Sequence, residues 1–190
     1  MDVQKAPFDW GTVKPHTHQV EVVDDFYTKF KNNPNGNYNL IGSMGCGKGI
    51  LSAACTKLAI EQFEIERVLV LSPSLIVKHQ IVDEYAMLGL ELSSSMDNRR
   101  LVRTHLGTTA HGASCTFPQV NRLPELFRNL CSQKPTIGIC DEIQFLGLEK
   151  SWGEAVKYAL EPCKIRFGMT GTMFRTDNRL IPFVNYRRVK

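Results

Sequence analysis

Residues 42–48 have the composition and spacing of a loop that binds phosphate groups. Gly42, Gly47 and Lys48 match the pattern G-x-x-x-x-G-K, in which backbone N–H groups and a lysine ammonium surround phosphate oxygens. A strand is predicted before the loop and a helix after it, so a phosphate would lie at the positive end of the helix dipole. The alternative is a glycine-rich turn that serves only tight packing. The predicted phosphate-binding residues are Gly42, Ser43, Met44, Gly45, Cys46, Gly47, Lys48 and Gly49.

Gly49 follows the lysine at a position where this pattern has Ser or Thr, whose hydroxyl binds a magnesium ion. The direct contact from that hydroxyl is therefore missing. Because Mg²⁺ keeps several of its waters in proteins, a water molecule could fill the gap, and so could Ser52 if the first helical turn brings it close. The sequence thus predicts nucleotide binding more firmly than magnesium-dependent hydrolysis.

Asp141 and Glu142 are two adjacent carboxylates at the end of an apolar run, residues 136–140. Ligands of open α/β sheets bind at the carboxyl ends of the strands, where this pair would lie. Asp141 is the predicted ligand of a magnesium ion that bridges the β- and γ-phosphates of ATP, and Glu142 is the predicted base for the attacking water. The alternative is that Asp141 caps the next element and Glu142 is only solvated.

The elements that must position these groups alternate between short apolar runs and longer helical patterns, which is typical of parallel strands with crossover helices. We therefore predict an α/β fold with a central, mostly parallel sheet flanked by helices. Strands are predicted at residues 38–42, 67–72, 113–117, 136–141 and 165–170, and helices at 20–30, 48–63, 74–88, 118–131 and 151–160. Residues 91–112 are predicted to form a flexible surface excursion with a possible short strand at 101–104.

The composition suits one compact domain, because 190 residues with 43% hydrophobic side chains can bury a core without disulfides. The formal charge of +4 favours a polyanionic partner only slightly. The six cysteines form no C-x2-C pair, which fits a reducing compartment. No apolar stretch approaches the roughly 20 residues that span a bilayer, so we expect a soluble, cytoplasmic protein with no membrane partner.

In their order and spacing, these motifs resemble the first RecA-like lobe of superfamily 2 helicases and translocases. The resemblance covers about residues 18–175 and is strongest to the branch with type III restriction subunits and DEAH-type DNA-repair helicases. Residues 141–144, Asp-Glu-Ile-Gln, are similar to the family's D-E-x-H/Q motif, which implies that Gln144 acts with the catalytic residues Lys48, Asp141 and Glu142. Thr170, Gly171 and Thr172 resemble the T-G-T-P-F-R segment that couples hydrolysis to strand movement, with Met173 in place of proline.

Three further segments match the family less closely. Pro73 and Ser74 resemble a motif that contacts the nucleic-acid backbone, and Thr116 and Gln119 resemble a second such segment. Both are also ordinary helix starts after a strand. Gln19 corresponds to the glutamine that recognises adenine, although the Lys-Pro dipeptide at residues 14–15 is out of the usual register.

The resemblance implies a fold of the RecA-like P-loop NTPase type. It implies residues 1–36 as the N-terminal segment and adenine-motif helix, 37–176 as the lobe, and 177–190 as a segment leading toward a second lobe. ATP and Mg²⁺ are the implied cofactors, and the implied partners are a second RecA-like lobe and a nucleic acid, with DNA favoured over RNA. The parent protein would be an ATP-dependent helicase or translocase, and the isolated lobe would hydrolyse ATP slowly or not at all. The main alternative, suggested by Gly49 and Met173, is a catalytically weakened nucleotide-binding module that switches a protein contact.

Overall fold

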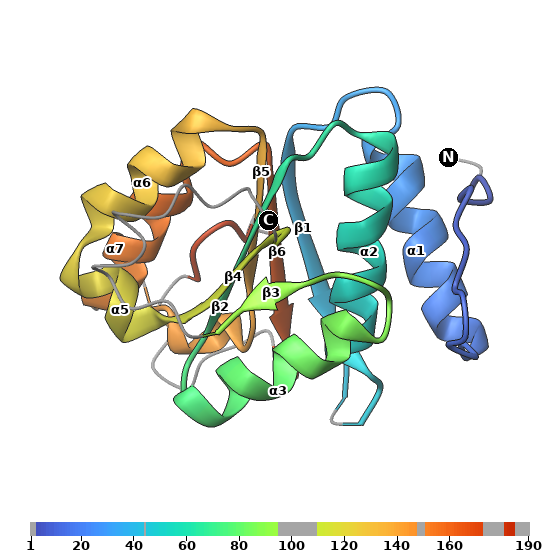
Figure 1. Ribbon diagram of the computed structural model, residues 1–190, viewed down its shortest axis with the longest axis horizontal. Coiled ribbons are helices and arrows are strands. Elements are labelled where there is room, and N and C mark those ends of the chain that lie inside the picture. The colour runs from blue at the N-terminus through green and yellow to red at the C-terminus, as the bar shows by residue number, and fades with distance from the viewer. Residues whose placement is uncertain (1–2, 44, 95–109, 148–150, 173–180, 185–190) are drawn as a thin grey trace, which may run out of the picture.

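The computed structural model describes residues 3–43, 45–94, 110–147, 151–172 and 181–184. Its centre is a six-stranded sheet in which every strand pair is parallel (Figure 1). The strands are β1 (Gly36–Ile41), β2 (Arg67–Ser72), β3 (Leu92–Ser93), β4 (Gly112–Thr116), β5 (Thr136–Cys140) and β6 (Ile165–Thr170). Their order across the sheet is β1-β6-β5-β2-β4-β3. The predicted mostly parallel α/β sheet is therefore confirmed.

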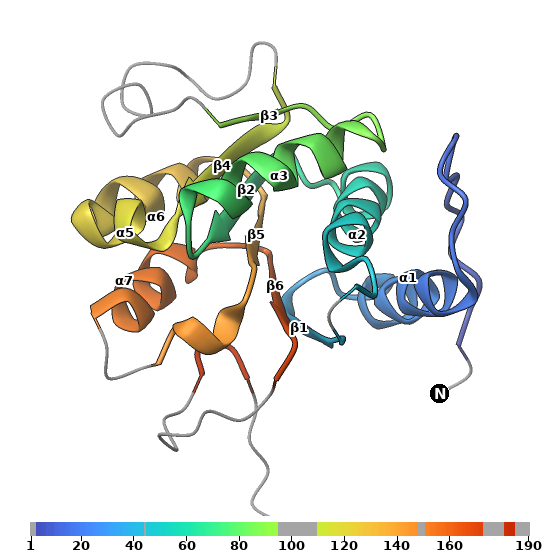
Figure 2. The ribbon, with the colours of Figure 1, turned by 90° about the horizontal axis from the view of Figure 1, so that it is seen from below.

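Helices cover both faces of the sheet (Figure 2). They are α1 (Thr17–Phe30), α2 (Lys48–Gln62), α3 (Leu75–Ala86), α5 (Phe117–Arg122), α6 (Pro124–Gln133) and α7 (Ser151–Leu160), with a short 3-10 helix η1 (Ile143–Phe145). Figure 2 shows α1, α2 and α3 on one side and α5, α6 and α7 on the other. The chain thus folds into three layers.

The alternation of side chains along β2 explains the two cores. Val68 and Val70 pack into the cluster formed with α1, α2 and α3, whereas Leu69 and Leu71 pack into the cluster formed with α5, α6 and α7. Successive strand residues point to opposite faces, and both faces of this strand are covered, so all six of its residues are buried. This is why the strand is a continuous apolar run in the sequence.

Several predicted bounds are confirmed and a few are wrong. The strands at 67–72 and 165–170 and the helix at 151–160 have the predicted ends, and the other strands differ by one or two residues. α1 begins three residues before the predicted start, which places Gln19 in its first turn. The sheet also contains a sixth, two-residue strand, β3, that was not predicted. The possible strand at 101–104 lies outside the described residues.

The single helix predicted at 118–131 is two helices, because the chain breaks at Leu123. Leu123 has φ −143° and ψ 61°, and Pro124 begins α6. A proline lacks the N–H that a continuous helix needs and disfavours the helical conformation in the residue before it. The break reorients the chain between α5 and α6, both of which contact α7.

The order of the strands brings the predicted catalytic segments together. The phosphate loop follows β1, the acidic turn follows β5, and Thr170 ends β6. These three strands are neighbours in the sheet, and Ile41 of β1 pairs with Thr170 of β6. Since the strands are parallel, all three segments leave the same edge of the sheet.

No helix in the described parts of the chain is long and apolar enough to cross a bilayer.

Candidate nucleotide-binding site

The phosphate loop joins β1 to α2, as its sequence predicts. Gly47 precedes the first residue of α2 and has φ 77° and ψ 39°, a left-handed conformation that favours glycine. A Cβ atom on Gly42 would lie 2.5 Å from Cys46 Sγ, so the first glycine lets the loop fold closely on itself. Lys48 Nζ donates a hydrogen bond to Gly42 O at 3.2 Å, across the mouth of the loop. Met44 lies outside the described residues.

Gln19 packs against the loop from α1. Its Nε2 donates to Cys46 O at 3.4 Å, and its Oε1 accepts from the N–H of His16 at 3.0 Å. A Cβ atom on Gly47 would lie 2.6 Å from Gln19 Nε2, so the third glycine also makes room for this amide. The Gln19 side chain is buried, yet an amide has two donor hydrogens and two acceptor lone pairs, which leaves capacity for a further partner.

The two acidic residues lie just beyond β5, opposite the loop. The N–H of Asp141 donates to Leu71 O at 2.8 Å, which ties the turn to β2. Glu142 has φ 51° and ψ 52°, a left-handed conformation that is strained for a residue with a side chain. Its Oε1 lies 3.8 Å from Lys48 Nζ. The turn therefore directs one carboxylate at the lysine of the phosphate loop.

Burial, and after it the neighbouring charge of Glu142, raise the pKa of Asp141 to about 6, although the charge of Lys48 acts in the opposite direction. The site thus holds more negative charge than its own lysine neutralises. A divalent cation bound here would lower that pKa again, because it favours the ionised carboxylate. Within the described residues, no group of three or more His, Cys, Asp and Glu side chains could hold a metal alone.

Gln144 links the acidic turn to β6. Its Nε2 donates to Glu142 Oε2 at 2.6 Å, and its Oε1 accepts from Thr170 Oγ1 at 2.7 Å. The N–H of Thr172 in turn donates to Thr170 Oγ1 at 2.9 Å. The three motifs found in the sequence are therefore joined by one continuous set of polar contacts that runs from Lys48 to Thr172.

A cavity of about 420 Å³ opens between the phosphate loop, the acidic turn and α3. Four of its lining residues, on α3, were missed by sequence reasoning: Val77, Gln80, Ile81 and Glu84. Glu84 approaches Gly49 so closely that a Cβ atom built on the glycine would overlap its carboxylate. The unexpected glycine after Lys48 was the available signal that another group occupies this space.

The residues predicted to contact nucleic acid lie at the same edge of the sheet, beyond β5. β2 and β4 are neighbours, with Ser72 paired to Thr116, so the segments that follow them start side by side. Pro73 and Ser74 precede α3, and Ser74 Oγ accepts from the N–H of Val77 at 3.4 Å, which caps that helix.

Thr116 and Gln119 form a reciprocal cap at the start of α5. Thr116 Oγ1 accepts from the N–H of Gln119 at 3.4 Å, and Gln119 Oε1 accepts from the N–H of Thr116 at 2.9 Å. The buried Lys78 of α3 donates to Gln119 Oε1 at 3.5 Å. The structure thus brings the two predicted nucleic-acid segments together, and it gives Thr116 and Gln119 a local role in positioning them.

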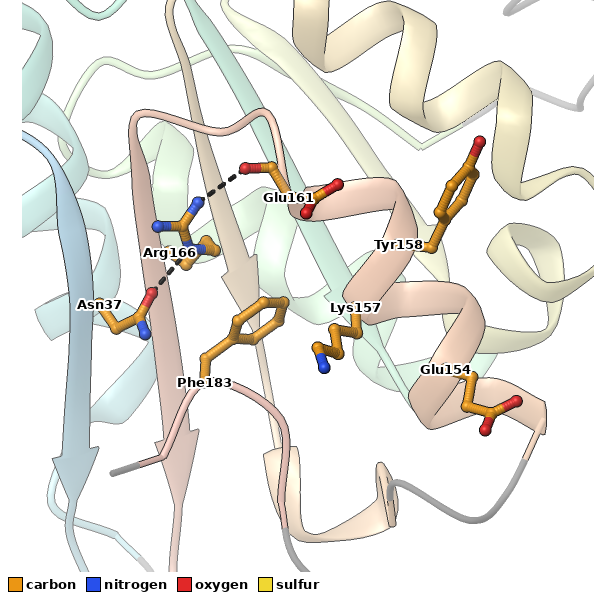
Figure 3. Close-up of a pocket in the computed structure, with 7 residues that line it drawn as sticks. All are labelled: Asn37, Glu154, Lys157, Tyr158, Glu161, Arg166 and Phe183. Carbon is orange, nitrogen blue, oxygen red and sulfur yellow. Dashed lines mark hydrogen bonds between the residues drawn. The ribbon is translucent and has the colours of Figure 1, made fainter. Parts of the chain in front are cut away.

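A larger cavity, of about 630 Å³, is shown in Figure 3 and shares no lining residue with the cavity beside the phosphate loop. It is lined from the beginnings of β1 and β6, from α7 and from Phe183. Arg166 donates from Nε to Asn37 Oδ1 at 2.6 Å and from a terminal nitrogen to Glu161 O at 2.9 Å, so its guanidinium is engaged. The two strand residues that line it, Asn37 and Arg166, lie at the amino ends of β1 and β6, whereas ligands of open parallel sheets bind at the carboxyl ends.

This chain is similar to known proteins over most of its length. The family described as type III restriction enzyme, res subunit, matches residues 12–175. An uncharacterised protein of Mycobacterium leprae is 31% identical over 146 residues, and one of Mycobacterium tuberculosis is 30% identical over 147 residues. Each alignment covers 77% of this chain and 24% of the relative, so the chain spans about a quarter of the length of these proteins.

Two solved structures share the fold. The SWI2/SNF2 ATPase core of Sulfolobus solfataricus, solved in complex with double-stranded DNA, superposes with a TM-score of 0.72 at 18% identity and covers 90% of this chain and 34% of that one. The UvsW helicase of bacteriophage T4 superposes with a TM-score of 0.58 at 16% identity, over 85% of this chain and 54% of that one. The family match and the parallel sheet show that this chain belongs to the type III restriction enzyme res subunit family and is a superfamily 2 first RecA-like lobe.

Proposed function

We propose that this chain is the ATP-binding motor lobe of an ATP-dependent nucleic-acid helicase or translocase. The observation that supports this most directly is the run of contacts from Lys48 through Glu142 and Gln144 to Thr170. A nucleotide switch also has to relate the state of the phosphates to a distant surface, but it has no need of a carboxylate held beside the phosphate loop. A motor needs both the carboxylate that activates water and the connection from it to the end of β6.

The residues present fit ATP with a magnesium ion. Backbone N–H groups at the start of α2 and the ammonium of Lys48 would hold the phosphates, and Gln19 would contact the adenine. Asp141 would hold the cation, since a buried carboxylate beside a second negative charge is relieved by a divalent ion. When bound, the ion supplies neutralisation of charge on the transferred phosphoryl group.

Glu142 is the proposed base for the water that attacks the terminal phosphate. Gln144 holds Oε2, which leaves Oε1 directed toward the phosphate loop and within 3.8 Å of Lys48 Nζ. A carboxylate fixed in this way can orient a water and accept its proton as the water oxygen bonds to the terminal phosphorus and the bond from that phosphorus to the bridging oxygen of the departing ADP breaks. We propose that residues 37–176 act as this lobe and that a second lobe in the parent protein completes the site.

Nucleic acid, and DNA in preference to RNA, is the proposed track. The paired helix starts at Ser74 and Thr116 offer main-chain groups at one edge of the sheet, which is the kind of surface that binds a phosphate backbone. The archaeal structure with the same fold was solved on double-stranded DNA, which supports this choice.

The test is the ATPase activity of the parent protein with Glu142→Gln. We expect nucleic-acid-stimulated hydrolysis to fall at least about 100-fold, the usual contribution of a general base, while ATP binding is retained. Glu154→Gln, on the exposed surface of α7, is the matched control and should leave the rate unchanged. Hydrolysis that survives Glu142→Gln would reject Glu142 as the base and with it the proposed hydrolytic site. A parent protein that binds ATP without hydrolysing it would favour the switch module that the missing hydroxyl at Gly49 suggests.

A further inference from the structure

The carboxylate of Glu84 fills the volume that a side chain at position 49 would need. Gly49 is the second residue of α2, in the position whose usual hydroxyl reaches the magnesium ion. A Cβ atom there would overlap Glu84 Oε2 and would also press on the rest of the carboxylate. The absence of a side chain on one helix is thus matched by the approach of a carboxylate from another.

The position of Glu84 is fixed by the residue that follows it. Tyr85 is completely buried, and its hydroxyl donates to Ser52 Oγ at 3.1 Å and lies 3.3 Å from Thr56 Oγ1. These contacts fasten α3 onto the first two to three turns of α2, the helix that follows the phosphate loop. Because adjacent helical residues point about 100° apart, Glu84 is turned from the core toward the cavity while Tyr85 anchors the helix.

Ser52 is not available for the role of the missing hydroxyl. Its side chain is 1% exposed, its hydroxyl donates to Gly49 O at 2.9 Å, and its oxygen accepts from Tyr85. A water molecule was the other possibility that the sequence left open. The structure adds a third, the carboxylate of Glu84, which lies where a side chain on Gly49 would begin.

Glu84 faces the same cavity as the groups that would hold the nucleotide. Lys48, Asp141 and Glu142 line that cavity with it, and the charge of Glu84 is felt at Asp141. Within the described part of the chain its hydrogen-bond donor is Gln80 Nε2, 3.4 Å from Oε1, a long contact that leaves Oε2 directed at Gly49. Carboxylate oxygens are the protein ligands that Mg²⁺ prefers.

We propose that Glu84 holds the divalent cation that accompanies the nucleotide, in place of the hydroxyl that Gly49 lacks. The proposal rests on the proposed nucleotide-binding function and assigns Glu84 as an additional ligand. It explains why the glycine is tolerated in an otherwise complete phosphate loop. The metal ligand that is usually on α2, at the position of Gly49, is then supplied from α3 by Glu84.

The test measures the affinity of the 190-residue chain for a fluorescent ATP analogue, first with EDTA and then with saturating Mg²⁺. Glu84→Gln should reduce the Mg²⁺-dependent gain in affinity by about tenfold, in the range typical for groups that support a bound metal. Asp83→Asn removes the exposed carboxylate next along α3 and should keep the full gain. The affinity of Mn²⁺ for the chain with bound ADP, followed by electron paramagnetic resonance, should fall by a similar factor in Glu84→Gln alone.

A double-mutant cycle with Gly49→Ser separates this role from a general effect on folding. The new side chain displaces Glu84 and supplies a hydroxyl, so Glu84→Gln should change the gain by less than about twofold in the Gly49→Ser background. Equal losses in both backgrounds, or a normal gain in Glu84→Gln, would overturn the proposal. Lys48→Ala reports on the underlying function, because nucleotide binding that is insensitive to this change would reject the site itself.

Discussion

The side-chain amide of Gln144 donates a 2.6 Å hydrogen bond to the carboxylate of Glu142, the proposed base. The same amide accepts a hydrogen bond from Thr170 at the end of β6. Gln144 therefore contacts both Glu142, the group that would act on water, and Thr170, in the segment that would couple hydrolysis to movement of the nucleic acid. A mutation of Gln144 can therefore separate ATP binding from the coupling of hydrolysis to nucleic acid.

Gln144→Ala in the parent protein should retain ATP binding and lose most of the stimulation of hydrolysis by nucleic acid. A hydrogen bond to a charged group contributes about 1.5 to 3 kcal/mol, so the stimulated rate should fall by about tenfold or more. Thr170→Val should have a similar effect, and the double variant should be little worse than either single one, because both remove one connection. Gln133→Ala, exposed at the end of α6, is the control. Fully additive losses would contradict a shared path.

Asp141→Asn should stabilise the nucleotide-free chain at neutral pH. Burial raises the pKa of Asp141 from 3.8 to about 6, so its ionisation disfavours the folded state by up to about 3 kcal/mol. The stability that its protonated form contributes is fully present below about pH 4 and is lost as the pH rises through about 6. Asp141→Asn has no carboxyl group to ionise at this position, so its stability does not fall in this way as the pH rises.

Melting curves between pH 4 and pH 8, recorded with EDTA, check this expectation. The two proteins should melt together near pH 4 and separate by several degrees above pH 6, since 1 kcal/mol corresponds to about 2 to 4 °C in a domain of this size. Asp83→Asn, which neutralises an exposed carboxylate, should follow the unmodified chain. A difference that does not change with pH would mean that the charge of Asp141 is not the cause.

Gln19→Ala should weaken ATP binding by about tenfold and GTP binding by less. The change removes the contact with Cys46 O and opens a gap beside Gly47, and it also removes the group proposed to recognise adenine. Competition by unlabelled ATP and GTP against one fluorescent nucleotide gives both affinities. Glu21→Gln, exposed two residues later on α1, should leave both unchanged. Equal losses for the two nucleotides would restrict Gln19 to supporting the loop.

The sequence predicted most of the sheet because its strands are buried on both faces. Residues 67–72 form an unbroken apolar or small run apart from Arg67, and such a run, set between two helical patterns, has few alternatives to a central strand. The loop before α2 was also predictable, since G-x-x-x-x-G-K has a mechanism and not only a pattern. Local patterns were sufficient wherever the constraint itself was local.

Two features were missed for different reasons. The break at Leu123 was predictable, because Pro124 disfavours a helical conformation in the residue before it, although the helical periodicity on either side favours one continuous helix. The approach of Glu84 to Gly49 was not readable, because it depends on how α3 packs on α2 through Tyr85, a contact that no spacing along the chain encodes. Gly49 alone indicated that the usual hydroxyl is missing, but it did not indicate that Glu84 lies in its place.

Ile76→Glu should weaken nucleic-acid binding without destabilising the chain. Leu75 and Ile76, in the first turn of α3, are 64% and 81% exposed beside Ser74, so a carboxylate there would face a bound phosphate backbone and remain solvated otherwise. One repulsive charge at such a surface should reduce the affinity by about three- to tenfold at low salt, and less as salt increases. Met87→Glu places the same charge at the other end of α3, where the side chain is 60% exposed, and should have little effect. Equal losses at the two ends would show that only the net charge of the chain matters, and no loss at Ile76 would place the track elsewhere on the sheet edge.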